Sequence, residues 1–90
     1  MNNKKVYGMA IKNDEFYDLL LKGDLRIDQL VNCLKSYKSF LGVWQEPLSE
    51  YQVFVFDNSN DRTECFKHLD EYKFKTLRLY QMFDASDYVR

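Results

Sequence analysis

The sequence predicts a small α+β fold with the element order of a split β-α-β-β-α-β unit. Strand-like and helix-like patterns alternate along the chain in that order. The best-defined part covers residues 51–83, where the run Tyr51–Phe56 is rich in β-branched and aromatic residues. A polar turn, a helical pattern and a second strand-like run follow it. Right-handed crossovers in this order place the helices on one face of an antiparallel sheet.

The first half of the chain contributes a strand and two helices. Lys5–Ile11 is a plausible first strand, and Asn13 can then N-cap a short helix that Gly23 ends. Apolar residues recur next at three- and four-residue steps, which indicates a second helix with one buried stripe. Asp24 or Asp28 lies at its start, and Gly42 is expected to end it. The stripe consists of Ile27, Leu30, Val31, Leu34, Tyr37 and Leu41.

The second half adds a hairpin, a helix and a last strand. Val43–Gln45 is a short candidate strand, and without it a three-stranded sheet with the same helix layer remains. Asp61 can N-cap the third helix, with Glu64 as the partner of a capping box. Thr76–Phe83 returns to strand-like residues. We therefore expect one ferredoxin-like domain over residues 1–90, its first crossover made of two helices and residues 84–90 forming a loose tail.

Composition and charge restrict the class of protein. The 90 residues contain 46% apolar and 17% aromatic residues, which is enough for a folded core. A net charge of −1 lacks the basic excess of a dedicated nucleic-acid binder. We expect no signal peptide, membrane span or cofactor, and a reducing, cytoplasmic location with both cysteines as small buried apolar residues.

Strand parity predicts an interaction surface. Side chains alternate across a strand, and the small residues Gly8 and Ala10 suit a face that helices cover tightly. The opposite residues would then form an apolar open face, which an antiparallel sheet normally keeps polar unless something covers it. Trp44 and Tyr80 are added as candidate binding anchors. The predicted surface is Tyr7, Met9, Ile11, Trp44, Tyr51, Val53, Val55 and Tyr80.

The polar turn over residues 57–61 is the part of the chain most suggestive of chemistry. Its carboxylates imitate the start of a calcium loop, but Arg62 replaces the required Gly and His68 the bidentate Glu. We therefore predict a turn that caps the next helix. With Val53–Asp57, Arg62 and Met82-Phe83, this third of the chain also resembles the small CRISPR-associated nucleases of the Cas-two type. The resemblance implies a divalent-metal role for Asp57.

A second resemblance concerns the first and third strands. Val6–Ile11 partly matches the first-strand hexamer of RNA-recognition motifs, although residues 50–56 match their third-strand octamer poorly. This resemblance implies single-stranded RNA binding, with bases stacked on Tyr7 and Tyr51. His68 lies one helical turn from Cys65, a spacing that could suit a nucleophile and its base or two metal ligands, but Cys65 also fits the buried stripe.

The leading hypothesis is a small interaction module that is not an enzyme. We expect a regulator or inhibitor, of a kind that phages and mobile elements encode, which dimerises or binds a protein through its apolar sheet face. The excess of large aromatic rings motivates this hypothesis. The partner is a protein or a second copy of the chain, with nucleic acid as the alternative that the RNA-recognition resemblance implies. No catalytic or metal-binding residue is predicted.

Overall fold

A computed structural model describes residues 5–44 and 49–80, and in this part of the chain it shows three helices and a four-stranded sheet. The α+β prediction is confirmed. Two helices connect the first strand to the second, as expected. The elements are β1 (Tyr7–Lys12), α1 (Asn13–Lys22), α2 (Leu25–Lys35), β2 (Phe40–Trp44), β3 (Tyr51–Phe56), α3 (Ser59–Asp70) and β4 (Arg78–Tyr80).

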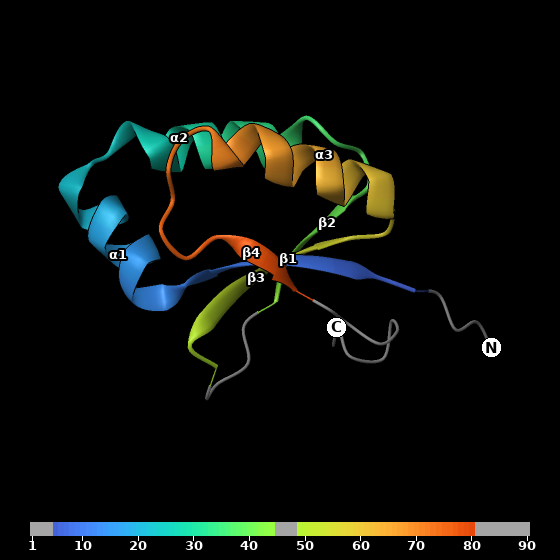
Figure 1. Cartoon of the computed structure of the whole chain (residues 1–90), viewed down its shortest axis with the longest axis horizontal. Coiled ribbons are helices and arrows are strands. Elements are labelled where there is room, and N and C mark those ends of the chain that lie inside the picture. Colours follow the sequence, from blue (N-terminus) through green and yellow to red (C-terminus); the bar gives the residue numbers. More distant parts are fainter. Residues whose placement is uncertain (1–4, 45–48, 81–90) are drawn as a thin grey trace.

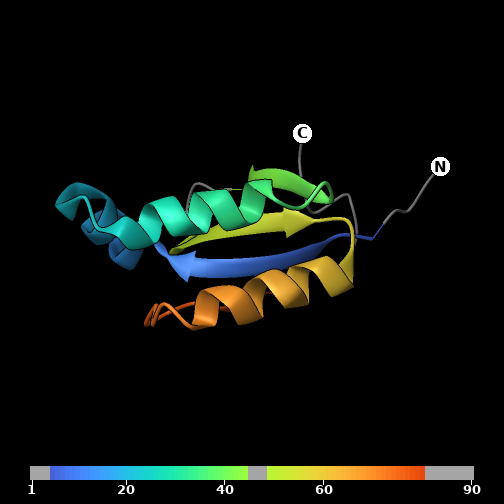
Figure 2. The same ribbon diagram turned by 90° about the horizontal axis from the view of Figure 1, so that it is seen from above.

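The four strands form one antiparallel sheet in the order β2-β3-β1-β4. The central pair is β1 with β3, in a register that sets Met9 opposite Phe54 and Ala10 opposite Val53. The edge strand β4 pairs Ala10 with Arg78. Figure 1 shows the helices on one side of this sheet. Viewed from above in Figure 2, α2 and α3 run beside each other, while α1 lies beyond one end of the strands.

The main core lies between the sheet and the helices. Met9, Phe54 and Phe56 point towards the helix layer and are at most 2% exposed. All three helices contribute buried residues to the same cluster, among them Leu19 from α1 and Leu69 from α3. Because each helix turns its apolar stripe to the same sheet face, this helix-side core is the larger of two apolar clusters in the described residues.

The second helix is shorter than its apolar periodicity predicts. α2 ends at Lys35, so Tyr37 is not helical and Gly42 lies inside β2 rather than at the end of a helix. The Ser36 hydroxyl donates to the Cys33 carbonyl at 2.7 Å, satisfying one of the last helical acceptors. The chain then turns, and the Tyr37 ring packs on Phe56 with the centroids 6.1 Å apart. Tertiary packing therefore overrides the helical spacing at this point.

Two predicted helix caps also differ from the structure. α1 starts after Lys12, so Asn13 is its first residue and not its cap; the Asn13 amide instead donates to the Ser49 carbonyl at 3.0 Å. α3 is capped by Asn58, whose side-chain oxygen accepts from the Asp61 backbone N–H at 2.9 Å. Gly23 ends α1 as predicted, in the left-handed conformation with φ 68°.

Parts of the prediction fall on residues that the structure leaves undescribed. The last strand covers Arg78–Tyr80, and residues 81–83 of the predicted strand lie outside the described residues. The same is true of the expected tail 84–90 and of Gln45 in the predicted Val43–Gln45 strand. Among the helices formed by described residues, none is long and apolar enough to cross a membrane.

Candidate functional site

The residues of the predicted interaction surface lie on both faces of the sheet. Tyr51, Val53, Val55, Trp44 and Tyr80 lie together on the face away from the helices, as expected. The prediction was wrong for the first strand. Met9 and Ile11 belong to the helix-side core and are 0% exposed, and Tyr7 pairs with Phe56 and faces α3.

The error came from the small residues of β1. Gly8 and Ala10 lie on the open face, where Gly8 is paired with Tyr80 and Ala10 with Arg78. The Arg78 guanidinium lies 4.5 Å from the centre of the Tyr51 ring, and β1 separates the strands of these two residues. Small side chains on β1 leave room for larger groups from both neighbouring strands to lie across it. Met9 and Ile11, rather than Gly8 and Ala10, fill the space between the sheet and the helices.

The open face carries a compact apolar cluster that the chain already covers. The open-face cluster consists of Val6, Ala10, Val53 and Val55, each at most 2% exposed. Trp44, Tyr51 and Tyr80 pack against it and are themselves half-buried. The centre of this face is therefore closed to a partner, and among the described residues the half-buried rings and the exposed Arg78 are what it presents.

The two tyrosines that the RNA-recognition resemblance implies do not form one platform. Tyr51 lies on the open face under Arg78, whereas Tyr7 lies on the helix side with the Arg62 guanidinium 5.8 Å from its ring centre. Bases bound on one face of a sheet require stacking rings on that same face. The structure therefore separates the two rings that this reading needs together.

The polar turn after β3 serves the start of α3. Asn58 caps the helix, and the Asp61 carboxylate accepts a hydrogen bond from the Ser39 hydroxyl at 2.7 Å. The Asp57 backbone N–H donates to the Ser39 carbonyl at 3.0 Å, which joins the turn to the segment before β2. Within residues 5–44 and 49–80, no three His, Cys, Asp or Glu side chains are grouped so that they could hold a metal ion.

Arg62 links α3 to the first strand. Its Nη1 donates to the Gly8 carbonyl at 2.8 Å, and its buried Nε has no hydrogen-bond partner within the described residues. Burial lowers the pKa of Arg62. These contacts give Arg62 a role in packing α3 against the first strand.

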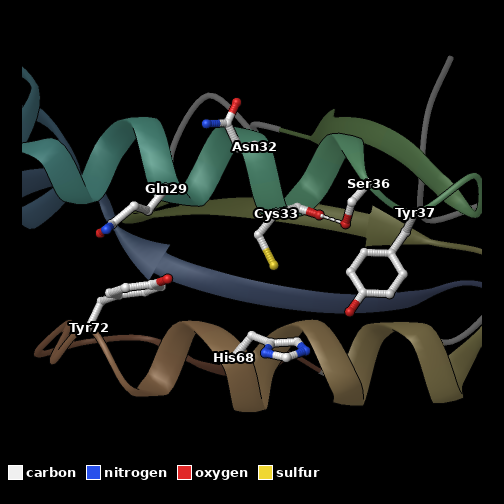
Figure 3. Close-up of a pocket in the computed structure, with 7 residues that line it drawn as sticks. All are labelled: Gln29, Asn32, Cys33, Ser36, Tyr37, His68 and Tyr72. Atoms are coloured by element: carbon white, nitrogen blue, oxygen red, sulfur yellow. Dashed lines mark hydrogen bonds between the residues drawn. The ribbon is translucent and has the colours of Figure 1, made fainter.

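A pocket of about 420 Å³ lies between α2 and α3. Figure 3 shows the Cys33 thiol pointing from α2 into the space between the two helices, with the His68 ring on the opposite helix. Burial is the main cause that raises the pKa of Tyr37 to about 12, so this phenol stays protonated at neutral pH. The lining residues are Gln29, Asn32, Cys33, Ser36, Tyr37, His68 and Tyr72.

The two cysteines meet beneath this pocket, which sequence reasoning missed. The Sγ atoms of Cys33 and Cys65 are 3.3 Å apart, with Cys33 half-buried at the pocket and Cys65 fully buried. Burial, more than its contact with Cys33, raises the pKa of Cys65. His68, considered as a partner for Cys65, is exposed and lines the pocket, which Cys65 does not. Cys65 is thus a poor candidate nucleophile towards a molecule in solution, and the Cys33 sulfur is within its reach.

The two most exposed apolar side chains of the described residues lie on either side of the turn between α1 and α2, and two further exposed ones lie on α1 before them. Leu21 is 86% exposed and Leu25 71%, with Leu20 at 46% and Tyr17 at 44%. We call these four residues the α1 tip. A sequence signal for it exists in the run Leu19-Leu20-Leu21, because three successive helical residues spread over about 200° and cannot all face the core. Leu19 is the one that is buried.

Comparisons with known proteins leave these surfaces to be interpreted from their chemistry alone: no family model matches the sequence, and neither a curated protein nor a solved structure gives a match.

Proposed function

We propose that this chain is a non-enzymatic protein-interaction module that associates with a second copy of itself through the α1 tip. The observation that carries the proposal is the exposure of Leu21 and Leu25, at 86% and 71%. Single exposed apolar residues are common on protein surfaces, but a contiguous group is typical of an interaction site. The closed centre of the open sheet face makes the tip the better candidate.

The geometry of the tip favours contact with another helix. Leu20 and Leu21 lie three and four residues after Tyr17, so both lie on the side of α1 that carries Tyr17. Gly23 ends that helix, and Leu25 begins the next one directly after the turn. Figure 2 shows this end of the molecule beyond the strands, where a partner would meet no obstruction from the sheet.

Charge along α1 supports a second copy as the partner. Asp14 and Glu15 lie in the first turn of the helix and Lys22 in the last. Within the chain, Lys22 pairs with Asp18 at 3.0 Å and the Glu15 carboxylate accepts from residues 75–76, so of the two first-turn carboxylates Asp14 is the one without such a link to another element in the described contacts. An antiparallel pair of α1 helices would bring the acidic end of each copy to the basic end of the other, as a two-fold interface requires. The net charge of −1 adds little long-range repulsion between copies.

The proposed dimer would act by occlusion, as a regulator or inhibitor that covers a surface without making or breaking a bond. We also propose the ferredoxin-like class for the fold. The element order and the strand order β2-β3-β1-β4 support it. In this arrangement the second helix of the first crossover packs on the sheet, which leaves α1 available at the end of the layer.

Sedimentation equilibrium across a range of micromolar concentrations tests the proposal. We expect a monomer–dimer equilibrium in the parent chain and, in Leu21→Lys, a dissociation constant raised at least about tenfold, because the lysine would bury a charge in the interface. Leu21 is 86% exposed in the single chain, so the substitution should leave the far-ultraviolet circular dichroism unchanged.

Val43→Lys is the matched control. Val43 is 50% exposed on the edge strand β2, where it would disturb a dimer formed by pairing of sheet edges. We expect Val43→Lys to dimerise like the parent. The proposal is wrong if the parent chain sediments as a monomer throughout, or if Val43→Lys dissociates the dimer and Leu21→Lys does not.

A further inference from the structure

We propose that Cys33 and Cys65 are a reversible redox pair, and that oxidation joins α2 to α3 through an intramolecular disulfide. The two Sγ atoms are already 3.3 Å apart, although 32 positions separate the residues in the sequence. A disulfide bond is about 2.0 Å long, so the two helices need only a small approach. The inference does not depend on the α1 tip or on self-association.

The pocket between α2 and α3 gives molecules in solution access to one of the two cysteines. Cys33 is half-buried and lines the pocket between α2 and α3, whereas Cys65 is 0% exposed and lies in the helix-side core. An oxidant in solution can therefore reach Cys33 but not Cys65. Figure 3 shows the Cys33 sulfur at the base of the space between the helices, with Tyr37 and Tyr72 towards its two ends. This arrangement assigns Cys33 as the sulfur that reacts first with the oxidant.

The chemistry balances with a peroxide as the oxidant. The Cys33 thiolate attacks one peroxide oxygen, so that an S–O bond forms, the O–O bond breaks and the released hydroxide leaves as water after taking a proton. Cys65 then attacks the Cys33 sulfur, forming the S–S bond while the S–O bond breaks. The departing hydroxide takes the Cys65 thiol proton and leaves as a second water. Two thiols lose two electrons, and one hydrogen peroxide becomes two waters.

The shielding of Cys65 and its contact with Cys33 explain why the pair would stay reduced until an oxidant modifies Cys33. Cys65 donates or accepts in the 3.3 Å contact with Cys33 and is shielded from solvent. A neutral buried thiol is inert until a neighbouring sulfur becomes electrophilic. In a reducing compartment the dithiol would persist, and the disulfide would form transiently on exposure to peroxide.

Titration of the reduced full chain with hydrogen peroxide tests the proposal. We expect both thiols to disappear together in an Ellman assay, with an intact mass lower by two hydrogen atoms and a Cys33–Cys65 cross-link in the peptide map. On a denaturing gel without reductant, the product should run at the mass of a single chain. Closing a loop of this length should raise the midpoint of thermal unfolding by roughly 10 °C or more, and dithiothreitol should reverse the change.

Two variants separate the roles of the sulfurs. In Cys33→Ser, the remaining Cys65 should keep its thiol under the same peroxide treatment, because it lies out of reach. In Cys65→Ala, Cys33 should gain oxygen atoms or form a disulfide between two chains. Should Cys65→Ala fold poorly, Cys33→Ser and the parent chain still decide the matter. The proposal is overturned if the parent chain only gains oxygen, cross-links only between chains, or retains both thiols.

Discussion

The two faces of the sheet are both buried, but by different means. On the helix side, Phe56 is covered by Tyr37, from the segment after α2, and by Phe40 of the neighbouring strand β2, whose ring centres lie 6.1 and 5.5 Å from its own. On the open face, Val55 is equally buried, and the described apolar groups packed against its cluster are half-buried rings of the sheet itself, from β2, β3 and β4. Within the described residues, Phe56 in a core between sheet and helices and Val55 in a cluster of strand residues thus have the same exposed fraction.

The difference teaches where the stability of the fold resides. The helix-side core contains large side chains from β1, β3 and all three helices, so its loss would separate the layers. The open-face cluster consists of small and β-branched residues of β1 and β3 and the segment before them. The exposed fraction of a side chain therefore does not say which face contributes more to the stability of the fold, whereas the volume that the side chain fills does.

The largest expected effect compares neighbours that point to opposite faces. Phe56→Ala should cost about 3–5 kcal/mol of the free energy of unfolding, because it removes a ring enclosed by other rings. Val55→Ala should cost about 2 kcal/mol, since two methyl groups are lost from a thinner cluster. Urea unfolding followed by circular dichroism measures both. Phe56→Leu serves as a milder variant if Phe56→Ala is unfolded.

Equal losses at Phe56 and Val55 would break the comparison. They would mean that the open face is packed as deeply as the helix side. A larger loss for Val55→Ala than for Phe56→Ala would reverse it.

The second prediction concerns the cover of the open face. Tyr51→Ala removes the ring beneath Arg78 and uncovers part of the open-face cluster, so it should cost about 1–2 kcal/mol. Tyr72→Ala is the matched control, since Tyr72 is 37% exposed after α3 and the same change there should stay within about 0.5 kcal/mol. Thermal and urea unfolding of the two variants measure the difference. If the two losses are the same, the Tyr51 ring contributes nothing to closing this face.

Local patterns in the sequence were enough for most of the fold. The strand Tyr51–Phe56 was predicted with its observed bounds because six successive β-branched, aromatic and polar residues alternate between two buried faces. Gly23 ends α1 because the left-handed conformation favours glycine there. The end of α2 was missed, since the ring contact of Tyr37 with Phe56 competes with continued helix and cannot be read from spacing.

The sites were harder to predict than the elements because they depend on contacts between distant residues. The face of β1 depends on Arg78 and Tyr80, which lie about seventy positions after Gly8. Size alone assigned Gly8 and Ala10 to the wrong side. The approach of Cys33 to Cys65 likewise depends on how α2 and α3 lie side by side. Only the exposed α1 tip had a local signal, in the run of three leucines.

An arginine lies over an aromatic ring on each side of the sheet, and the last and smallest prediction uses this symmetry. Arg78 lies over Tyr51 on the open face, and Arg26 lies 6.0 Å from the ring centre of Phe74 at the edge of the helix-side core. Asp24 holds Arg26 through contacts of 3.1 Å to Nε and 2.9 Å to Nη2. These hydrogen bonds lower the pKa of Asp24 from 3.8 to about 2.

The lowered pKa of Asp24 makes its contact with Arg26, at the edge of the helix-side core, sensitive to acid. A carboxylate with a lower pKa in the folded state stabilises the fold above its ordinary pKa, and this contribution is lost as the pH falls from about 4 to about 2. Asp24→Asn keeps a residue that caps α2 but removes the charge. Its thermal midpoint should therefore fall less steeply than that of the parent chain over this pH range. Asp18→Asn, which breaks only an exposed ion pair with Lys22, should retain the parental slope. If the thermal midpoint of Asp24→Asn falls with pH as steeply as that of the parent chain, the ion pair with Arg26 does not make the helix side more sensitive to acid than the open face.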